Sequence, residues 1–419
     1  MRIIVIGSGL LGVTSAYFLA QNGAEVTVLD RGDAAASATS YANAGMLTPS
    51  MADPWNSPGV FGQLLRYLGK EDAPLLLRVR ALPSILGWGL AFLANSSVEK
   101  FHASMAANLR LANYSRETLR TLREQLALSY DQKTAGTLRV FREQRALDAS
   151  AARWETLASF GLKTNVLSAA ATVTLEPALA EVREQLAGGI HCPQDESGDA
   201  RKFTETLAEK ARKAGVAFKF GTTVTGFKHD GEKITRVVPD TESLVADAVV
   251  ISAGSWSTPL LQGLGLRLPM RPVKGYSITL DAGAWNQRPG LPVIDDALHA
   301  AVTPLGQRLR VAGTAEFAGY DTSLSPARIE NLFSLLLNIY PGFAPHLDRA
   351  QAQPWAGLRP MSADGVPFIG RLRYQNLYLN TGHGHLGWTL AAGSARLLAD
   401  LMADKTPEID PAPYAADRR

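Results

Sequence analysis

Two hydrophobic patterns alternate along the chain, and each predicts a different kind of sheet. Nearly uninterrupted apolar runs cover residues 2–6, 24–29, 217–221 and 246–253, as in parallel strands buried on both faces. Apolar and polar positions alternate at residues 136–142, 276–280, 299–304 and 308–312, which is typical of antiparallel strands with one solvent-facing side. Helical periodicity covers residues 13–22, 100–128, 202–214 and 388–402. The pattern predicts an α/β fold, α+β overall, in which a Rossmann-like domain with a parallel sheet is interleaved with an antiparallel-sheet domain.

The order of these segments divides each domain into pieces. We expect residues 1–52, 196–265 and 353–419 to form the Rossmann-like domain. Residues 53–195 and 266–352 are expected to form the second domain, which would bind the substrate. The tail from residue 406 onward is rich in proline, alanine and charge, and we expect it to fray.

Residues 55–98 form an unusual segment of the second domain. Four basic residues, Arg66, Lys70, Arg78 and Arg80, precede an apolar stretch, residues 81–93, that includes Leu86, Trp88 and Phe92. This composition is typical of a helix that lies in a membrane interface. A hairpin that packs over the active site as a cover fits the same residues, and the sequence leaves both interpretations open.

Composition excludes several classes of protein. Hydrophobic residues make up 46% and charged residues 19%, which excludes a disordered chain, and a net charge of +3 is too small to indicate a nucleic-acid surface. Cys192 is the single cysteine, so an intrachain disulfide and a cysteine-rich metal site are excluded, and seven histidines without metal-ligand spacing predict no metal. The chain begins directly with a strand pattern and contains no apolar run long enough to cross a membrane, so we expect neither a signal peptide nor a transmembrane helix.

The first strand leads into a glycine-rich turn, Gly7-Ser8-Gly9-Leu10-Leu11-Gly12, and then into a helix. The first glycine permits the tight turn, the second lets the backbone approach a pyrophosphate, and the third lets helix and strand pack closely. Asp30 follows the second strand, where a carboxylate can bind an adenosine ribose hydroxyl. The motif predicts a dinucleotide site but does not separate NAD from FAD. A small, hydroxyl-rich loop at residues 37–46 favours FAD, because it can follow a long extended dinucleotide.

Six ordered motifs spread over the whole chain carry a family resemblance. They are residues 7–12, 40–45, 54–59, 272–277, 357–360 and 380–389. With them the sequence resembles the bacterial D-amino acid dehydrogenases, flavoenzymes of the D-amino acid oxidase and glycine oxidase superfamily. The resemblance implies hydride transfer from a D-amino acid to non-covalently bound FAD, and hydrolysis of the imino acid to a 2-oxo acid and ammonia. It also implies a quinone or other respiratory-chain acceptor, and a cytoplasmic or peripheral location at the cytoplasmic side of the inner membrane.

The motif and the resemblance together predict the residues that bind FAD. In the superfamily Val224 lies beside the adenine, Ala253 and Gly254 lie beside the pyrophosphate, and the loop after Gly382 contacts the flavin ring. The expected cofactor-binding residues are Gly7, Ser8, Gly9, Leu10, Leu11, Gly12, Asp30, Arg31, Ser40, Asn43, Ala44, Gly45, Met46, Val224, Ala253, Gly254, Gly384, Leu386, Gly387, Trp388 and Thr389. Backbone N–H groups at the start of the helix predicted at residues 388–402 would stabilise negative charge that develops on the flavin.

Three residues are expected to act on the substrate. Arg359 would bind the substrate carboxylate, because a planar guanidinium matches two carboxylate oxygens, and the superfamily keeps its carboxylate-binding arginine at this motif. The Tyr276 hydroxyl would share that carboxylate, and the resemblance implies that the backbone carbonyl of His385 faces the substrate amine. No general base is required when the amine binds deprotonated, so His383 is given no catalytic role.

The chain departs from the family pattern at three places. The family commonly has threonine in place of His385, alanine in place of Tyr41, and a tyrosine–lysine pair in place of Leu298 and His299. The preferred amino acid, the electron acceptor and the oligomeric state therefore stay open.

Three alternative functions remain: a glycine, sarcosine or D-amino acid oxidase that uses oxygen, a dehydrogenase of D-proline or hydroxyproline type, and a silent flavin-binding assembly subunit. The last is disfavoured because Arg359 and the loop after Gly382 are both intact.

Overall fold

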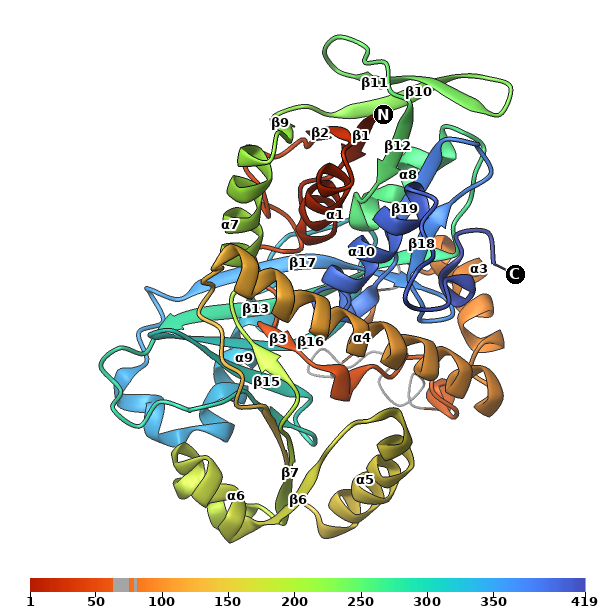
Figure 1. The fold of residues 1–419 in the computed structure, drawn as a ribbon. Helices are drawn as coiled ribbons and strands as arrows, with labels where there is room; N and C mark the ends of the chain where they lie inside the picture. Colours follow the sequence, from red (N-terminus) through yellow and green to blue (C-terminus); the bar gives the residue numbers. More distant parts are fainter. Residues whose placement is uncertain (63–74, 79–80, 419) are drawn as a thin grey trace.

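The computed structural model describes residues 1–62, 75–78 and 81–418, and two large sheets dominate it (Figure 1). The first sheet has six strands in the order β18 (Phe368–Arg371), β19 (Leu377–Thr381), β12 (Ala248–Ile251), β1 (Arg2–Ile6), β2 (Glu25–Leu29) and β9 (Ala217–Lys219). All neighbouring strands are parallel except β18, which runs antiparallel to β19. The predicted parallel sheet is confirmed, and the segments near residues 217 and 248 extend it as expected.

Helices from distant parts of the chain cover one face of this sheet. They are α1 (Leu10–Gln21), α7 (Ala200–Lys213) and α10 (Ala391–Met402), and the long helix α4 (Val98–Leu126) packs against α10. Together they bury an apolar core, because α1 and the central strands are almost wholly inaccessible to solvent. The opposite face is covered by α8 (Ser257–Gln262) and by the hairpin of β10 (Val224–Asp230) and β11 (Lys233–Pro239).

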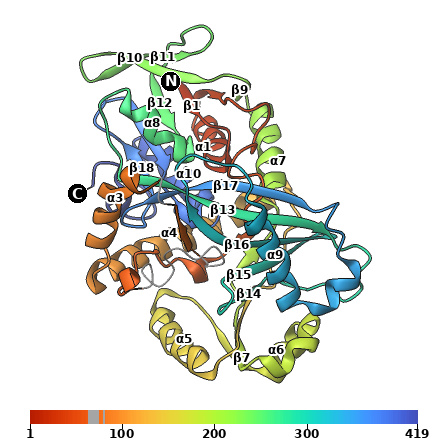
Figure 2. The same cartoon turned by 180° about the vertical axis from the view of Figure 1, so that it is seen from behind.

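The second sheet is mainly antiparallel. Its strand order is β17 (Gln353–Ser362), β13 (Met270–Asp281), β16 (Arg308–Phe317), β15 (Ala300–Leu305), β14 (Val293–Asp295), β5 (Thr137–Phe141), β7 (Gly188–Cys192) and β6 (Asn165–Ser168), with β4 (Leu75–Leu77) paired to β16. Helix α9 (Pro326–Ile339) covers one face (Figure 2), while α5 (Gln144–Leu157) and α6 (Ala169–Leu175) lie near its far end. A short pair, β3 (Met46–Leu47) and β8 (Glu196–Ser197), lies outside both large sheets.

Two expectations about this second sheet are wrong. The central strands β13, β15 and β16 are buried on both faces rather than exposed to solvent on one, since α9 covers one side and the part of the molecule built on the first sheet covers the other. The expected return to the first domain at residue 353 is also too early. Residues 353–362 form β17, which pairs with β13 over ten residues and so belongs to the second sheet.

The segment at residues 55–98 contributes the helix α3 (Leu82–Ala94), which has two different sides. Trp88 and Phe92 are buried against residues of β13 and β16, and the Trp88 indole N–H donates to the Met361 carbonyl at 3.1 Å. Leu86 and Leu90 are 62% and 71% exposed. The expectation that Trp88 and Phe92 enter a membrane interface is therefore wrong. The basic residues at 66, 70 and 80 lie outside the described part of the chain.

No helix in the described ranges is long and apolar enough to cross a membrane.

The C-terminal tail does not fray. Tyr414 is fully buried, and its hydroxyl donates to the Ala107 carbonyl of α4 at 2.7 Å. Arg418 donates to both carboxylate oxygens of Asp364, at 2.8 and 3.0 Å. The expectation of a frayed tail was wrong because it rested on the content of proline and charged residues. Composition does not reveal that one aromatic side chain packs against a distant helix.

Candidate active site

One cavity of about 1610 Å³ lies between the two sheets and brings together most of the predicted site residues. Those that line it are Gly7, Gly9, Leu10, Leu11, Asp30, Arg31, Ser40, Asn43, Ala44, Met46, Val224, Ala253, Gly254, Tyr276, Arg359, Gly384, His385, Gly387 and Trp388. Five predicted residues do not line it: Ser8, Gly12, Gly45, Leu386 and Thr389. The cavity therefore joins the glycine-rich turn at one end to Arg359 in the second sheet.

The glycine-rich turn is as tight as the sequence predicts. Gly7 has a φ of 104°, and a Cβ there would lie 2.7 Å from the Ser252 carbonyl oxygen. A Cβ at Gly12 would lie 1.8 Å from the Gly7 carbonyl oxygen, so Gly12 acts by allowing close packing rather than by touching a ligand. Helix α1 begins at this turn without a side-chain cap, and its Leu10 N–H donates to the Ser40 hydroxyl at 3.0 Å. A helix start of this kind favours a phosphate group.

Asp30 organises the end of β2. Its carboxylate accepts hydrogen bonds from the Ser8 hydroxyl at 2.8 Å and from the Gly32 N–H at 2.7 Å. Ser8 is fully buried, so its part in the site is to position Asp30. Asp30 itself lines the cavity, in agreement with its predicted place.

The loop at residues 42–45 is fixed to the second sheet by three side chains that the sequence reasoning missed. Ser277 donates to the Ala42 carbonyl at 2.7 Å, Arg310 to the Asn43 carbonyl at 2.9 Å, and Thr303 to the Ala44 carbonyl at 2.7 Å. These donors come from three neighbouring strands. The signal is a polar residue at a buried position of each strand, since a buried polar group needs a partner. Burial lowers the pKa of Arg310 to about 10, so it stays charged at neutral pH.

The loop after Gly382 contains two glycines in the left-handed region of backbone conformation and several buried side chains. Gly382 and Gly384 have φ angles of 83° and 57°. Helix α10 begins at Ala391, three residues later than predicted, because residues 384–386 form a separate 3-10 helix and residues 387–390 a turn. Thr389 does not face the cavity, and its hydroxyl instead accepts a hydrogen bond from the Thr48 N–H at 3.0 Å.

His383 is a buried, neutral side chain. The Ser394 hydroxyl donates to the Leu390 carbonyl, so it accepts from the Nε2–H of His383 at 2.8 Å. Nδ1 of the same ring then carries no proton and has no hydrogen-bond partner in the described structure. Burial lowers the pKa of His383 to about 3.

Several polar atoms of cavity-lining residues are buried without a partner among the described residues. They include the Ser252 hydroxyl, the Thr314 hydroxyl, Oδ1 of Asn380, Nδ1 of His383 and Nε1 of Trp388. Buried polar groups in proteins are nearly always hydrogen-bonded. The cavity therefore fits an extended polar cofactor such as FAD, with a phosphate at the start of α1.

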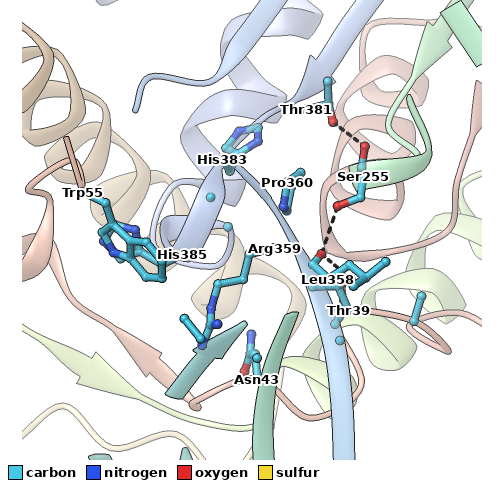
Figure 3. A pocket seen from close by; sticks show the side chains of 18 of the residues that line it. Thr39, Asn43, Trp55, Ser255, Leu358, Arg359, Pro360, Thr381, His383 and His385 are labelled. Carbon is cyan, nitrogen blue, oxygen red and sulfur yellow. Dashed lines mark hydrogen bonds between the residues drawn. The ribbon is translucent and has the colours of Figure 1, made fainter. Parts of the chain in front are cut away.

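Arg359 extends from β17 into the cavity beside Trp55 and His385 (Figure 3). Its guanidinium lies over Gly275 of β13, where a Cβ would come within 2.3 Å of Nη1. Nη1 donates to the Thr314 carbonyl at 3.4 Å, and no carboxylate within the described ranges pairs with this side chain. Burial lowers the pKa of Arg359 to about 10, so an uncompensated positive charge faces the cavity.

His385 lies next to this charge as a neutral ring. It stacks on Trp55 with ring centroids 5.5 Å apart, and its Nε2 lies 3.3 Å from the Met51 carbonyl oxygen. Burial, with the charge of Arg359, lowers the pKa of His385 to about 4. His299, another departure from the family pattern, is exposed and also lines the cavity.

Tyr276 does not contribute its hydroxyl to this group. Gly275 pairs with Gly357 in β17, so Tyr276 points to the opposite face of the sheet from Arg359. The hydroxyl donates to Oε2 of Glu316 at 2.6 Å, and Arg78 donates to Oε1 of the same carboxylate at 2.8 Å. The expectation that Tyr276 shares the substrate carboxylate with Arg359 is therefore wrong. The sequence placed it near the site correctly but assigned the wrong face of the strand.

Comparison with known proteins agrees with this geometry. The chain is 43% identical to a D-amino acid dehydrogenase of Sinorhizobium medicae over the full length of both, and 44% identical to one of Cereibacter sphaeroides, covering 100% of this chain and 95% of the relative. The fold is similar to a glycine oxidase from Geobacillus kaustophilus, with a TM-score of 0.78, 23% identity and coverage of 100% and 99%. It is also similar to an L-proline dehydrogenase from P. horikoshii, with a TM-score of 0.76, 19% identity and coverage of 99% and 96%.

A family model described as "DAO: FAD dependent oxidoreductase" matches residues 2–401, almost the entire chain. The matched region includes the glycine-rich turn, the loop at residues 42–45, Arg359 and the loop after Gly382. The chain therefore belongs to the DAO family of FAD-dependent oxidoreductases, and its cofactor is FAD.

Proposed function

We propose that this protein oxidises D-amino acids to 2-oxo acids and ammonia and passes the electrons to a quinone or another respiratory-chain acceptor. The observation that carries the proposal is the unpaired guanidinium of Arg359 in the FAD cavity, because an α-amino acid brings the matching carboxylate. The D-amino acid dehydrogenases at 43–44% identity support the same substrate class.

The chain's own residues hold and orient the substrate. Arg359 binds the carboxylate through two N–H groups, and the stacked pair of Trp55 and His385 excludes water beside it. FAD, when bound, would supply the acceptor for the α-hydrogen, which would leave the substrate as hydride. The neutral state of His385 leaves Arg359 as the dominant positive charge near the carboxylate, and the start of α10 places a helix dipole close to the flavin loop. The imino acid then hydrolyses in water.

FAD is expected to be held without a covalent bond. Cys192 is buried and does not line the cavity, and burial raises the pKa of its thiol to about 12, which makes it a poor nucleophile. His383 is held by Ser394. Acid precipitation should release yellow flavin into the supernatant. Colour that stays in the protein pellet would contradict a non-covalent cofactor.

The substrate class is tested by the flavin spectrum. Purified protein under nitrogen should lose its visible flavin absorbance when a D-amino acid is added, and should keep it with the L-isomers. Slow recovery of the colour after admission of air supports a dehydrogenase. Recovery as fast as turnover would assign an oxidase, and bleaching only by D-proline or hydroxyproline would assign the cyclic substrates. No bleaching with any amino acid would favour a silent flavin-binding subunit.

We also propose that the exposed side of α3 makes a peripheral contact with the cytoplasmic face of the membrane. Leu86, Leu90 and Phe61 are all more than half exposed and all line the cavity, so exposed apolar side chains border it on this side. A protein surface of this kind is expected to bind an apolar partner or a lipid interface. A quinone dissolved in the membrane would then reach the flavin through this opening.

The paired substitution of Leu86 and Leu90 by serine tests the membrane contact. Each buried leucine contributes roughly 1.5–3 kcal/mol on transfer out of water, so the variant should pellet much less with membrane vesicles. Dye-linked activity should stay close to the unsubstituted value. Substitution of the exposed Val166 by serine, on a distant strand, is the matched control. Loss of dye activity with unchanged vesicle binding would instead assign α3 as a cover of the active site.

A further inference from the structure

Strand β16 has an irregularity beside Arg359. Gly275 of β13 pairs with Ala315, but the next residue, Tyr276, pairs with Gly313. Thr314 is thereby left without a partner in β13, as the extra residue of a β-bulge. Its φ is 61°, in the left-handed region that a β-branched residue such as threonine strongly disfavours. A glycine would adopt this conformation without strain, so the threonine side chain needs another explanation.

The bulge lies at the unpaired guanidinium. The Thr314 carbonyl accepts a hydrogen bond from Nη1 of Arg359 at 3.4 Å, and Thr314 lines the same cavity. Its hydroxyl is buried and has no hydrogen-bond partner among the described residues, and the residue as a whole is 8% exposed. Bulges often re-aim a side chain at a functional site, and strained residues persist where function requires them.

We propose that the Thr314 hydroxyl is a second ligand of the substrate carboxylate, an inference that rests on the proposed D-amino acid substrate. The hydroxyl donates one hydrogen bond to a carboxylate oxygen while Arg359 donates two. The bulge fixes both groups, because the carbonyl of Thr314 orients the guanidinium while its side chain turns to the same ligand. Thr314 thus takes the role that sequence reasoning gave to Tyr276, whose hydroxyl is bound to Glu316 on the other face.

The test compares Thr314→Gly, Thr314→Val and Thr314→Ser. The glycine variant keeps the bulge and its carbonyl but removes both the strain and the hydroxyl, so its melting temperature should not fall. Loss of one hydrogen bond to a charged group predicts a drop of about ten- to a hundredfold in kcat/KM for the best D-amino acid in the glycine and valine variants. Thr314→Ser should recover most of the activity, since serine keeps the hydroxyl.

Binding of the 2-oxo acid product supplies a readout independent of turnover. Titration of the flavin spectrum with the product should give a dissociation constant raised by about ten- to a hundredfold in Thr314→Gly and Thr314→Val. Ala127→Gly is the matched control, because Ala127 also has a positive φ, of 49°, but lies exposed at the end of α4 and away from the cavity. It should be as active as the unsubstituted protein.

The possible failures are distinguishable. If the unsubstituted protein reduces its flavin with D-amino acids while Thr314→Gly and Thr314→Val keep full kcat/KM and product affinity, the role of Thr314 is overturned and the proposed function stands. Equal losses in Thr314→Ser and Thr314→Gly would also overturn it, because the hydroxyl would then not be the group that matters. If no D-amino acid bleaches the unsubstituted protein, the proposed function itself fails.

Discussion

Buried charged side chains have partners on one face of strand β13 and lack them on the other. On the cavity face, Arg359 lies over Gly275 and no carboxylate in the described structure balances it. On the opposite face, the Glu316 carboxylate accepts hydrogen bonds from both Tyr276 and Arg78. Lys274 on the same face lies 3.5 Å from Asp321. The face that stabilises the fold is internally satisfied, whereas the cavity face has a charge that only a ligand can satisfy.

This difference separates a structural network from a binding site. Burial raises the pKa of Glu316, but the hydrogen bonds from Arg78 and Tyr276 outweigh burial and hold the pKa below its ordinary value. Burial alone lowers the pKa of Arg359. A buried charge without a partner is costly, and proteins keep one where it is used. The comparison predicts that substitutions on the cavity face change activity and those on the opposite face change stability.

Arg359→Ala should have the largest effect. Loss of a charge-assisted bidentate contact, with the substrate carboxylate left unpaired, should lower kcat/KM by roughly a thousandfold or more while FAD stays bound. Arg359→Lys should recover only part, because an ammonium group lacks the planar fork. Steady-state kinetics with a dye acceptor measures both. A nearly normal kcat/KM in Arg359→Ala would show that the carboxylate binds elsewhere.

Gly275→Ala should have the next largest effect. The added Cβ would lie 2.3 Å from Nη1 of Arg359, and the flexible guanidinium can move away from it. A displacement of this kind at a binding group can cost about a hundredfold in rate, while the melting temperature should change little. Gly226→Ala is the matched control, since a Cβ there meets nothing within 4 Å. Large loss of stability with unchanged KM would argue against this placement of Arg359.

Tyr276→Phe should reverse that pattern. It removes the hydrogen bond to Glu316, and the free energy of unfolding should fall by about 1–3 kcal/mol, because a buried carboxylate loses one of its donors. Since the hydroxyl faces away from the cavity, kcat/KM should change by no more than about twofold. A tenfold change in rate corresponds to about 1.4 kcal/mol, so this is a change of less than about 0.5 kcal/mol in the activation free energy. Denaturant unfolding and dye-linked kinetics provide the two measurements. A tenfold loss of kcat/KM at normal stability would restore Tyr276 to the substrate site.

The smallest effect is expected in how the free energy of unfolding depends on acidic pH. The pKa of His385 is about 4 in the folded protein, mainly because of burial, and about 6.5 in an unfolded chain. The unfolded state therefore binds the proton more readily between pH 6.5 and pH 4, so the stability that neutral His385 supports is lost as pH falls through this window. His385→Asn should flatten the stability curve there. Glu316→Gln should lower the free energy of unfolding at neutral pH, and should flatten the curve only below about pH 4.5, because the folded-state pKa of that carboxyl is lowered. An unchanged curve in His385→Asn would contradict the burial of its ring.

The sequence was sufficient to predict those parts of the site that depend on a few consecutive residues. The crowded glycine positions 7 and 12 require glycine whatever surrounds the chain, and Asp30 follows directly from the end of a buried strand. Arg359 was identified from its motif together with the family resemblance. These features are encoded within a few residues, so a linear pattern is enough to find them.

Tertiary structure alone decided which side chains meet. Period-two alternation shows that Tyr276 and Gly275 point to opposite faces, but not which face borders the cavity; the pairing of β13 with β17 settles it. The bulge at Thr314 and the three donors to the loop at residues 42–45 arise from contacts between strands far apart in sequence. The same is true of Trp88, for which the sequence left a membrane interface and a packed cover open, and of Tyr414, which lies in a tail expected to fray; both side chains are buried. The sequence pattern shows the chemical type of each residue. The hydrogen-bond partner of a buried polar group is decided only when distant segments come together in the folded chain.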